Sequence, residues 1–243
     1  MNIVTPKIEL IASTQLTNTQ AGGTVIEDLM TLDPSATDAE NLIEFSGRSC
    51  YQSFHKPNPA TAKNADYLMR TLFSQEHWSI AEHATATLYA TGVSRALTHE
   101  LIRHRHLSYS QLSQRFVDES DANVVMPPAI RDSNDEDGKR IWAREVQDSL
   151  DAYAGWSADL MLQDVPRKKA REAARSVLPN AVETRIVVTG NHRAWVEVIL
   201  RRIAPDADAE IRQFAGLALE ALRPTAPTLY EEVERIIGEM ERN

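Results

Sequence analysis

The feature that most constrains the fold is a polar string of thirteen residues, RHRHLSYSQLSQR, at positions 103–115. The string holds three arginines, two histidines and three serines, and it has almost no aliphatic side chains. Such residues make a poor core, so the string must lie where the chain meets solvent or a ligand. The run before it, residues 94–102, predicts a helix, because its apolar side chains recur every three to five positions.

The arginines of the string have two explanations. Cations in the last turn of a helix complement the partial negative charge of its C-terminus, which would make the first arginines structural. Arg103, Arg105 and Arg115 are also planar forks that suit phosphate. The neighbouring serine, glutamine and tyrosine side chains add hydrogen-bond donors and acceptors for a planar polar ligand. The string as a whole therefore favours a binding role.

The charge balance and cysteine content exclude several classes. A net charge of −9 argues against a nucleic-acid coat protein or a polybasic membrane binder, and it makes a local basic cluster more informative. Cys50 is the single cysteine, which excludes an internal disulfide and a zinc site built from thiolates. We expect it to be a small buried hydrophobe on a helix with Leu42, Ile43 and Phe45. No apolar run reaches membrane-spanning length and no signal-peptide core is present, which predicts a cytoplasmic protein without membrane or nucleic-acid partners.

The rest of the sequence mixes short strands with longer helices. Residues 13–37 are polar and predict a loop with a short helical turn near 26–30. Asn191 has the position of a helix N-cap directly after a β-branched run. Repeats and linkers are not evident, so we predict one α+β domain over residues 1–243. The expected strands are 3–12, 84–91 and 182–189, and the expected helices are 37–50, 60–75, 94–102, 139–162, 167–178, 191–203, 210–222 and 228–240.

A second polar cluster, EHWSIAEH, occupies positions 76–83. Its two histidines and two glutamates raise the question of a metal site. His77 and His83 are six residues apart, which does not place both on one helical face as a separation of four would. The spacing therefore favours a turn between helix and strand that presents ring nitrogens and hydroxyls to a ligand, with no metal.

The motifs together resemble one family. RHR at 103–105, then seven residues and Ser113, resembles the signature of the flavin-dependent thymidylate synthases. The resemblance spans roughly residues 40 to 220, and the matching blocks come in the family's order: His77–Ser79 with Glu82 and His83, then the string to Arg115, Arg175-Ser-Val-Leu-Pro, Asn191–Arg193 and Arg201-Arg202.

This resemblance implies a fold and a reaction. The family fold is a small antiparallel sheet flanked by helices, assembled as a homotetramer whose active sites are shared between subunits. The reaction is the methylation of dUMP to dTMP, with methylenetetrahydrofolate as carbon donor, NADPH as reductant and FAD as hydride carrier. The chain lacks a glycine-rich strand–loop–helix for a dinucleotide. Holding FAD between subunits would explain that absence.

The resemblance also assigns site residues by position. The positions matching the dUMP site are Glu100, Leu101, Ile102, Arg103, Gln111, Leu112, Ser113, Gln114, Arg115, Arg175 and Arg202. The positions matching the FAD site are Ser79, Arg103, His104, Arg105, Gln111, Asn191, His192, Arg193 and Glu197, with His77 expected beside the flavin ring or folate.

Individual roles follow for a few of these residues. Arg202 corresponds to the catalytic arginine that favours ionisation at N3 of the uracil, and Arg115 and Arg175 suit the phosphate. Ser113 is expected to bind rather than attack, because no histidine–acid pair is evident to activate it. Two positions depart from the family pattern. Asp206 replaces a histidine found in some relatives, and Glu197 stands where Asn or His is common, so we expect Glu197 at a hydroxyl or ring edge, away from phosphate.

Two other classes of protein would use similar residues. A nucleotide- or RNA-binding module needs the same arginines but not the distant blocks at 175, 191 and 202, and it would purify colourless where a flavoprotein is yellow. A metal-dependent nucleotide hydrolase would use His77, His83 and His104 with Glu82, and chelators would inactivate it.

Overall fold

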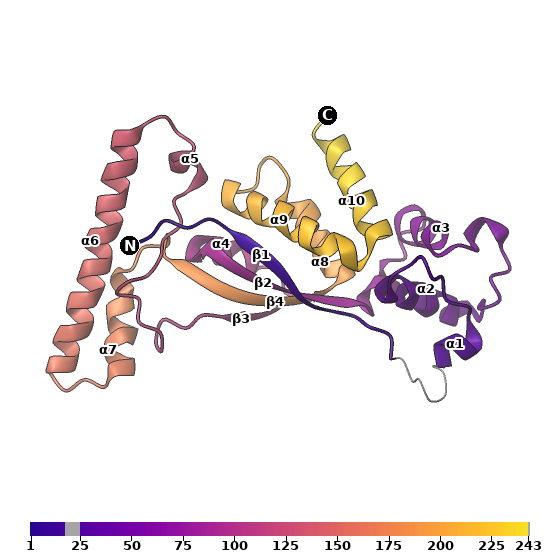
Figure 1. The fold of residues 1–243 in the computed structure, drawn as a ribbon, viewed down its shortest axis with the longest axis horizontal. Helices are drawn as coiled ribbons and strands as arrows, with labels where there is room; N and C mark the ends of the chain where they lie inside the picture. Colours follow the sequence, from indigo (N-terminus) through magenta and orange to yellow (C-terminus); the bar gives the residue numbers. More distant parts are fainter. Residues whose placement is uncertain (18–24, 243) are drawn as a thin grey trace.

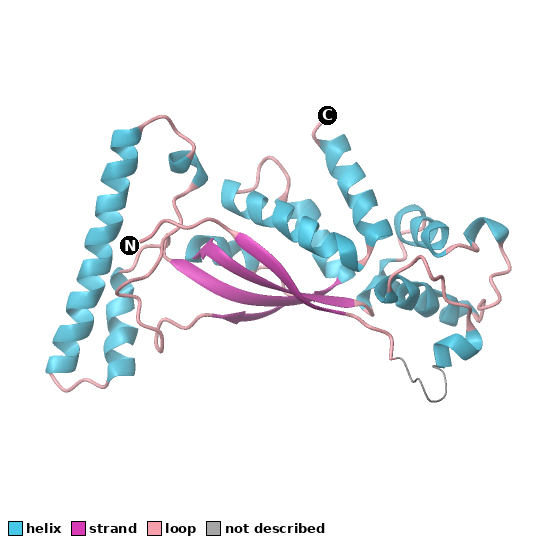
Figure 2. Cartoon of the chain, in the orientation of Figure 1, coloured by secondary structure: helices cyan, strands magenta, loops and turns pink. Residues whose placement is uncertain are grey.

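The computed structural model describes residues 1–17 and 25–242, so positions 18–24 of the predicted loop lie outside the described residues. Figures 1 and 2 show a small antiparallel sheet flanked by helices, as the resemblance predicted, and this agrees with the α+β class expected from the sequence. The strand order is β1-β2-β4-β3, and the strands are β1 Lys7–Ser13, β2 Thr85–Ser94, β3 Ser108–Gln111 and β4 Glu183–Asn191.

The helices form three groups around the sheet (Figure 1). One group covers a face of the sheet: α8 His192–Arg202, α9 Ala209–Leu222 and α10 Pro227–Met240. Another lies at one end: α5 Pro128–Arg131, α6 Glu136–Leu162, α7 Arg167–Ala174 and the 3-10 turn η4 Arg175–Val177. The third lies at the other end: α1 Val25–Leu29, α2 Asp38–Tyr51, α3 Asn64–Leu68, the π-helical η2 Met69–Ser74 and the 3-10 turns η1 Pro59–Thr61 and η3 Trp78–Glu82. Helix α4 Arg95–Leu101 follows β2, and η5 Arg223–Thr225 links α9 to α10.

Buried and more accessible side chains alternate along the two central strands, β2 and β4. In β2, Ala86, Leu88 and Ala90 are buried, whereas Thr87 and Tyr89 on the other face are half-buried. Strand β4 alternates in the same way. Because successive side chains of a strand point to opposite faces, this pattern directs one face of the sheet onto the helices.

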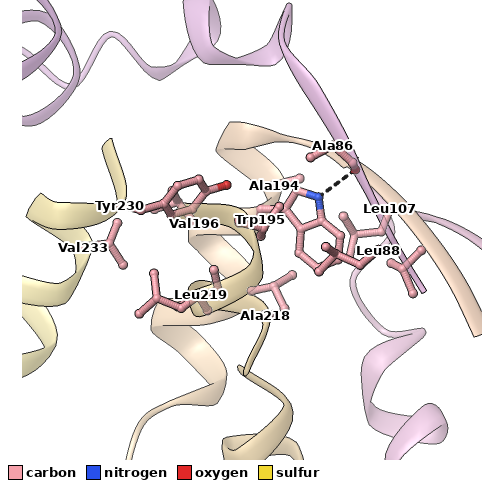
Figure 3. Packing of buried hydrophobic residues seen from close by; sticks show 14 of the residues in the cluster. Ala86, Leu88, Leu107, Ala194, Trp195, Val196, Ala218, Leu219, Tyr230 and Val233 are labelled. Atoms are coloured by element: carbon pink, nitrogen blue, oxygen red, sulfur yellow. Dashed lines mark hydrogen bonds between the residues drawn. The ribbon is translucent and has the colours of Figure 1, made fainter. Parts of the chain in front are cut away.

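Trp195 of α8 is the centre of the main core (Figure 3). Its side chain is fully buried, and its indole N–H donates to the Ala86 carbonyl at 3.1 Å. Gly190 lies beside it, and a Cβ there would be only 2.2 Å from Leu107 and 3.3 Å from the indole nitrogen. The glycine therefore allows Leu107, a buried member of the polar string, to anchor the string in the core.

Two strands lead directly into helix caps. The Ser94 hydroxyl accepts the Leu97 N–H at 3.0 Å at the start of α4, and the Asn191 side chain accepts the Ala194 N–H at 2.8 Å at the start of α8. Both helix starts were predicted. Because β2 and β4 are antiparallel, α4 begins at one end of the sheet and α8 at the other. The two helices thus run toward each other and bring their C-terminal ends together.

Two expectations fail at particular residues. Cys50 is exposed rather than buried, because the buried face of α2 ends at Arg48 and the last turn projects beyond its neighbours. That face holds a buried ion pair, Arg48 Nε to Glu44 Oε1 at 2.6 Å. Helix α6, which the apolar spacing predicted over 139–162, also buries fewer apolar side chains than that spacing implies, since Ile141 and Trp156 are exposed.

A strand inside the polar string was not predicted. Residues 108–111, Ser-Tyr-Ser-Gln, pair with β4 in the register Ser108 with Thr189 and Gln111 with Ile186. The composition of the segment gives no apolar alternation, so only the pairing with β4 defines it as a strand.

Candidate functional site

Arg202 lies where the C-terminal ends of α4 and α8 meet. Its Nε–H donates to His104 Nε2 at 2.9 Å, and its Nη1 donates to Glu100 Oε2 at 2.9 Å. Nη2 also reaches the Glu100 carbonyl at 3.3 Å. The Arg202 side chain is 18% exposed, so the guanidinium is held firmly but remains open to a ligand on one side.

A cavity of about 250 Å³ opens beside this arginine. The start of the polar string, residues 103–107, forms one wall, and α8 forms the other with Ala194, Glu197, Val198, Arg201 and Arg202. A second cavity of about 160 Å³ is lined by Glu82, His106, Asn191, Arg193, Ala194 and Glu197. Because the cavities share His106, Ala194 and Glu197, they form one depression along α8. We call it the α8 groove.

Positive charge dominates the α8 groove. Arg193 pairs with Glu82 at 2.5 Å, and Arg201 pairs with Glu197 at 3.2 Å. Arg103 and Arg105 are exposed on its wall, and within residues 1–17 and 25–242 neither has an ion-pair partner. Two cations without counter-charges at a concave surface attract an anionic ligand.

The His104 imidazole is in a setting that disfavours its charged form. Burial lowers the pKa of His104, and the nearby Arg202 and Arg201 lower it further, while Glu197 acts in the opposite direction. A neutral imidazole can accept one hydrogen bond, which agrees with the contact from Arg202.

A second group of predicted residues lies at the far end of β3. The Ser113 carbonyl accepts the N–H groups of Phe116 and Val117 at 3.1 and 3.0 Å, which closes a turn around Gln114 and Arg115. Arg115 Nη1 is 3.9 Å from Glu172 Oε2. The pKa of Glu172 is lowered mainly by Lys169, with smaller effects from Arg115 and Arg175. Arg115 and Arg175 therefore both lie near Glu172 of α7. We call Arg115, Glu172 and Arg175, with the turn at Ser113 and Gln114, the α7 cluster.

The α7 cluster and the α8 groove are at opposite ends of one strand. The four residues of β3, at roughly 3.3 Å each, give about 13 Å of separation before the flanking segments are counted. Gln111 lies between them, and its side-chain nitrogen donates to the hydroxyls of Thr98 and Thr184, both at 3.2 Å. In a single chain, the residues expected to bind dUMP are thus divided between two places.

Some predicted residues do not face the α8 groove with their side chains. Leu101 and His192 are fully buried in the core. His192 Nδ1 is 2.8 Å from the Tyr230 hydroxyl, and burial lowers the pKa of His192 to about 4. Only main-chain atoms of these two residues could contact a ligand. Ser79 and His77, by contrast, are exposed in and just before η3, the turn that also carries Glu82.

Arg95 and Glu119 are charged residues that the sequence did not single out. Arg95 Nη1 is 3.5 Å from the Leu112 carbonyl, and burial together with nearby Arg175 lowers the pKa of Arg95. Glu119 is only 4% exposed, and burial raises its pKa to about 7 against the opposing effect of Arg95. Each residue looks like an ordinary surface charge in the sequence, because its burial depends on segments far away in the chain.

Two structural features concern metal binding and the membrane. Over the described ranges, no group of three or more His, Cys, Asp or Glu side chains is placed to hold a metal ion, so the metal-dependent hydrolase hypothesis has no candidate centre there. Within the same ranges, every helix is too short or too polar to span a bilayer.

Comparison with known proteins gives consistent matches. Residues 32–228 match the family model described as thymidylate synthase complementing protein, Thy1. The chain is 52% identical over 209 residues to the flavin-dependent thymidylate synthase of Mycobacteroides abscessus, covering 82% of each chain. It is 49% identical over 212 residues to that of Mycobacterium tuberculosis, covering 83% of each. A crystal structure of thymidylate synthase X from Helicobacter pylori with FAD and dUMP has the same fold, with a TM-score of 0.62, 18% identity, and coverage of 94% of this chain and 98% of that one.

Proposed function

Since the chain belongs to the thymidylate synthase complementing proteins, the flavin-dependent thymidylate synthases, we propose that it makes dTMP from dUMP by reductive methylation. In the balanced reaction, methylenetetrahydrofolate supplies the one-carbon unit and becomes tetrahydrofolate, while NADPH and a proton supply the reducing equivalents. We assign this activity to one domain over residues 1–243 acting in the cytoplasm in de novo dTMP synthesis.

The observation that carries the proposal is the anchored Arg202. A guanidinium has five N–H groups, and three of them are used on His104 and Glu100. The remaining N–H groups on Nη1 and Nη2 can therefore donate to a ring bound in the α8 groove. An arginine stays charged at any working pH, so it can stabilise the anion that forms when uracil loses its N3 proton. That ionisation makes the ring carbon more nucleophilic toward the one-carbon unit.

The nucleotide phosphate is assigned to the α7 cluster. Arg115 and Arg175 can pair with it through charge-assisted hydrogen bonds, and the turn at Leu112, Ser113 and Gln114 can close around it. Ser113 binds in this scheme and does not act as a nucleophile. The segment Glu100–Arg103 and Gln111 complete the dUMP site near the uracil and sugar.

Division of these residues between two ends of β3 supports a shared active site. One nucleotide must contact the phosphate-binding arginines and Arg202 at the same time. We propose that the α7 cluster of one subunit completes the α8 groove of another within a homotetramer.

The residues of the α8 groove fit FAD as a bound cofactor. Arg103 and Arg105, which have no ion-pair partner among the described residues, suit its pyrophosphate. The Glu197 carboxylate is paired with Arg201, which limits its repulsion of phosphate. Bound FAD would carry a hydride from NADPH to the transferred carbon. The residues that would hold the cofactor are Ser79, Arg103, His104, Arg105, Gln111, Asn191, Arg193 and Glu197, with His192 through its main chain and His77 beside the ring or the folate.

The test is NADPH oxidation and dTMP formation by purified protein, with and without dUMP. We expect a yellow protein whose dTMP production requires dUMP, NADPH and methylenetetrahydrofolate and survives chelators. Arg202→Ala should retain FAD while dTMP formation falls by several orders of magnitude, and Arg202→Lys should restore little because an ammonium lacks the planar fork.

Each alternative class of protein predicts a different result in this test. A colourless protein that binds dUMP without turnover would indicate a nucleotide-binding module, and chelator-sensitive hydrolysis would indicate a metal-dependent hydrolase. Light scattering that shows a stable monomer with tightly bound FAD would contradict the shared site.

A further inference from the structure

His104 makes a contact that its assignment as a cofactor-binding residue does not explain. Its Nε2 is 2.9 Å from Nε of Arg202. The arginine Nε always carries a hydrogen and never accepts, so Nε2 of His104 must accept this hydrogen bond. The imidazole is therefore neutral, with its proton on Nδ1.

This contact restricts the rotation of the guanidinium about the line through Nη1 and Nη2, which the two contacts with Glu100 leave open. Glu100 holds the two Nη atoms through its carboxylate and its carbonyl. The hydrogen bond to His104 fixes the Nε edge, and together the three contacts define the plane of the guanidinium. The plane decides where the two free N–H groups point.

We propose that His104 is a positioning residue whose neutral Nδ1–H imidazole orients the Arg202 guanidinium toward the uracil ring. The inference rests on the proposed role of Arg202 and adds a second protein group on which that role depends. His104 does not touch the uracil in this scheme.

Protonation of His104 should release Arg202. A protonated imidazole has an N–H at Nε2, so it loses the acceptor and places a positive charge against the guanidinium. The charged and titratable groups around the ring are Arg202, Arg201 and Glu197 on α8, Glu100 on α4, and Arg103, Arg105 and His106 in the string. Burial and the arginines on α8 lower the pKa of His104. The positioned state should therefore exist above that lowered pKa and disappear as the pH falls through it.

The experiment compares two variants of His104 with a matched control. His104→Gln offers a carbonyl oxygen that can accept from Arg202 and cannot be protonated, whereas His104→Ala offers no acceptor. His99→Gln makes the same change on an exposed histidine of α4. All proteins are assayed as FAD-saturated oligomers, and dUMP affinity, kcat for dTMP and FAD content are measured from pH 5.5 to 9.

A spectroscopic readout separates positioning from cofactor binding. The 19F shift of bound 5-fluoro-dUMP reports ionisation at N3 and needs neither NADPH nor folate. We expect His104→Ala to lower kcat by about 10- to 100-fold, the effect of a small misplacement of a catalytic group, and to shift the 19F titration to higher pH. His104→Gln should recover most of kcat and lack the acidic fall in kcat that we expect for the unmodified enzyme. Affinity for dUMP should change less than kcat.

Several results would overturn the inference. One is a normal kcat for His104→Ala once FAD is saturating, which would leave His104 as a cofactor contact alone. Another is an acidic fall that persists unchanged in His104→Gln. If His104→Ala fails to fold, the pH profile of His104→Gln still decides. Normal dTMP formation by Arg202→Ala would instead remove the proposed role of Arg202, so the two failures are distinguishable.

Discussion

Replacing Glu119 by glutamine should stabilise the protein at alkaline pH and have little effect at acidic pH. Glu119 is 4% exposed, and its Oε1 has no hydrogen-bond partner within the described ranges. Burial raises the pKa of Glu119 from the ordinary 4.5 to about 7, and Arg95 only partly offsets this, while Glu183 and Asp118 add to it. The folded state thus holds the Glu119 proton more tightly than the unfolded chain does.

The sign and size of the effect follow from proton linkage. Between pH 4.5 and 7 the folded state binds more proton than the unfolded state, so the free energy of unfolding decreases as the pH rises. The full difference between the two pKa values corresponds to about 3 kcal/mol of unfolding free energy, at 1.36 kcal/mol per pH unit. At pH 5 the unfolded glutamate is already mostly ionised, so about 2.5 kcal/mol of the loss occurs between pH 5 and pH 8. Glu119→Gln should remove this loss.

The assay is urea unfolding of Glu119→Gln and the unmodified protein at pH 5 and pH 8, at one protein concentration. The matched control is Glu145→Gln on the exposed side of α6, which should change the free energy of unfolding by less than about 0.5 kcal/mol at both pH values. Equal effects of Glu119→Gln at the two pH values would refute the reasoning. They would show that Glu119 is ionised in the folded protein across this range, with Arg95 as an effective counter-charge.

Three other changes have expected outcomes. Arg115→Ala should weaken dUMP binding by roughly 1.5–3 kcal/mol and deoxyuridine binding far less, as measured by calorimetry, because only the nucleotide carries the phosphate. Trp195→Phe should lower the free energy of unfolding by about 2–3 kcal/mol in a denaturant titration, because it leaves the buried Ala86 carbonyl without its indole donor and opens space in the core. Gly92→Ala should destabilise by more than about 1 kcal/mol in the same assay, because φ there is +65° and a Cβ would lie 2.0 Å from the Thr5 carbonyl oxygen.

The sequence predicted those parts of the fold that local chemistry determines. Asn191 marked a helix start because a cap requires only a side chain and the next three backbone groups, and the apolar spacing of residues 94–102 predicted the other helix. β3 was not predicted, because its four polar residues become a strand only by pairing with β4. Cys50 was expected in the core but is exposed. The expectation failed because helical spacing alone does not show where a helix extends past its neighbours.

The candidate site was predictable as a set of residues but not as a geometry. The motif resemblance selected Arg202, Arg115 and Arg175 together, although in one chain they belong to two places separated by β3. The contact between Arg202 and His104 links residues 98 positions apart. A spacing rule along one helix or strand cannot report such a pair, and neither can it report that the His192 imidazole is buried against Tyr230.

The fold also shows how one arginine can have both a structural role and a ligand-binding role. Helices α4 and α8 begin at opposite ends of an antiparallel strand pair, so their C-terminal ends meet at the α8 groove. Carbonyl groups at two helix ends make this place favourable for cations, whatever they bind. Glu100 illustrates this, because its carbonyl and its carboxylate both hold Arg202. Structural stabilisation thus fixes the arginine without using all its donors, and the unused N–H groups give the same residue its proposed chemistry.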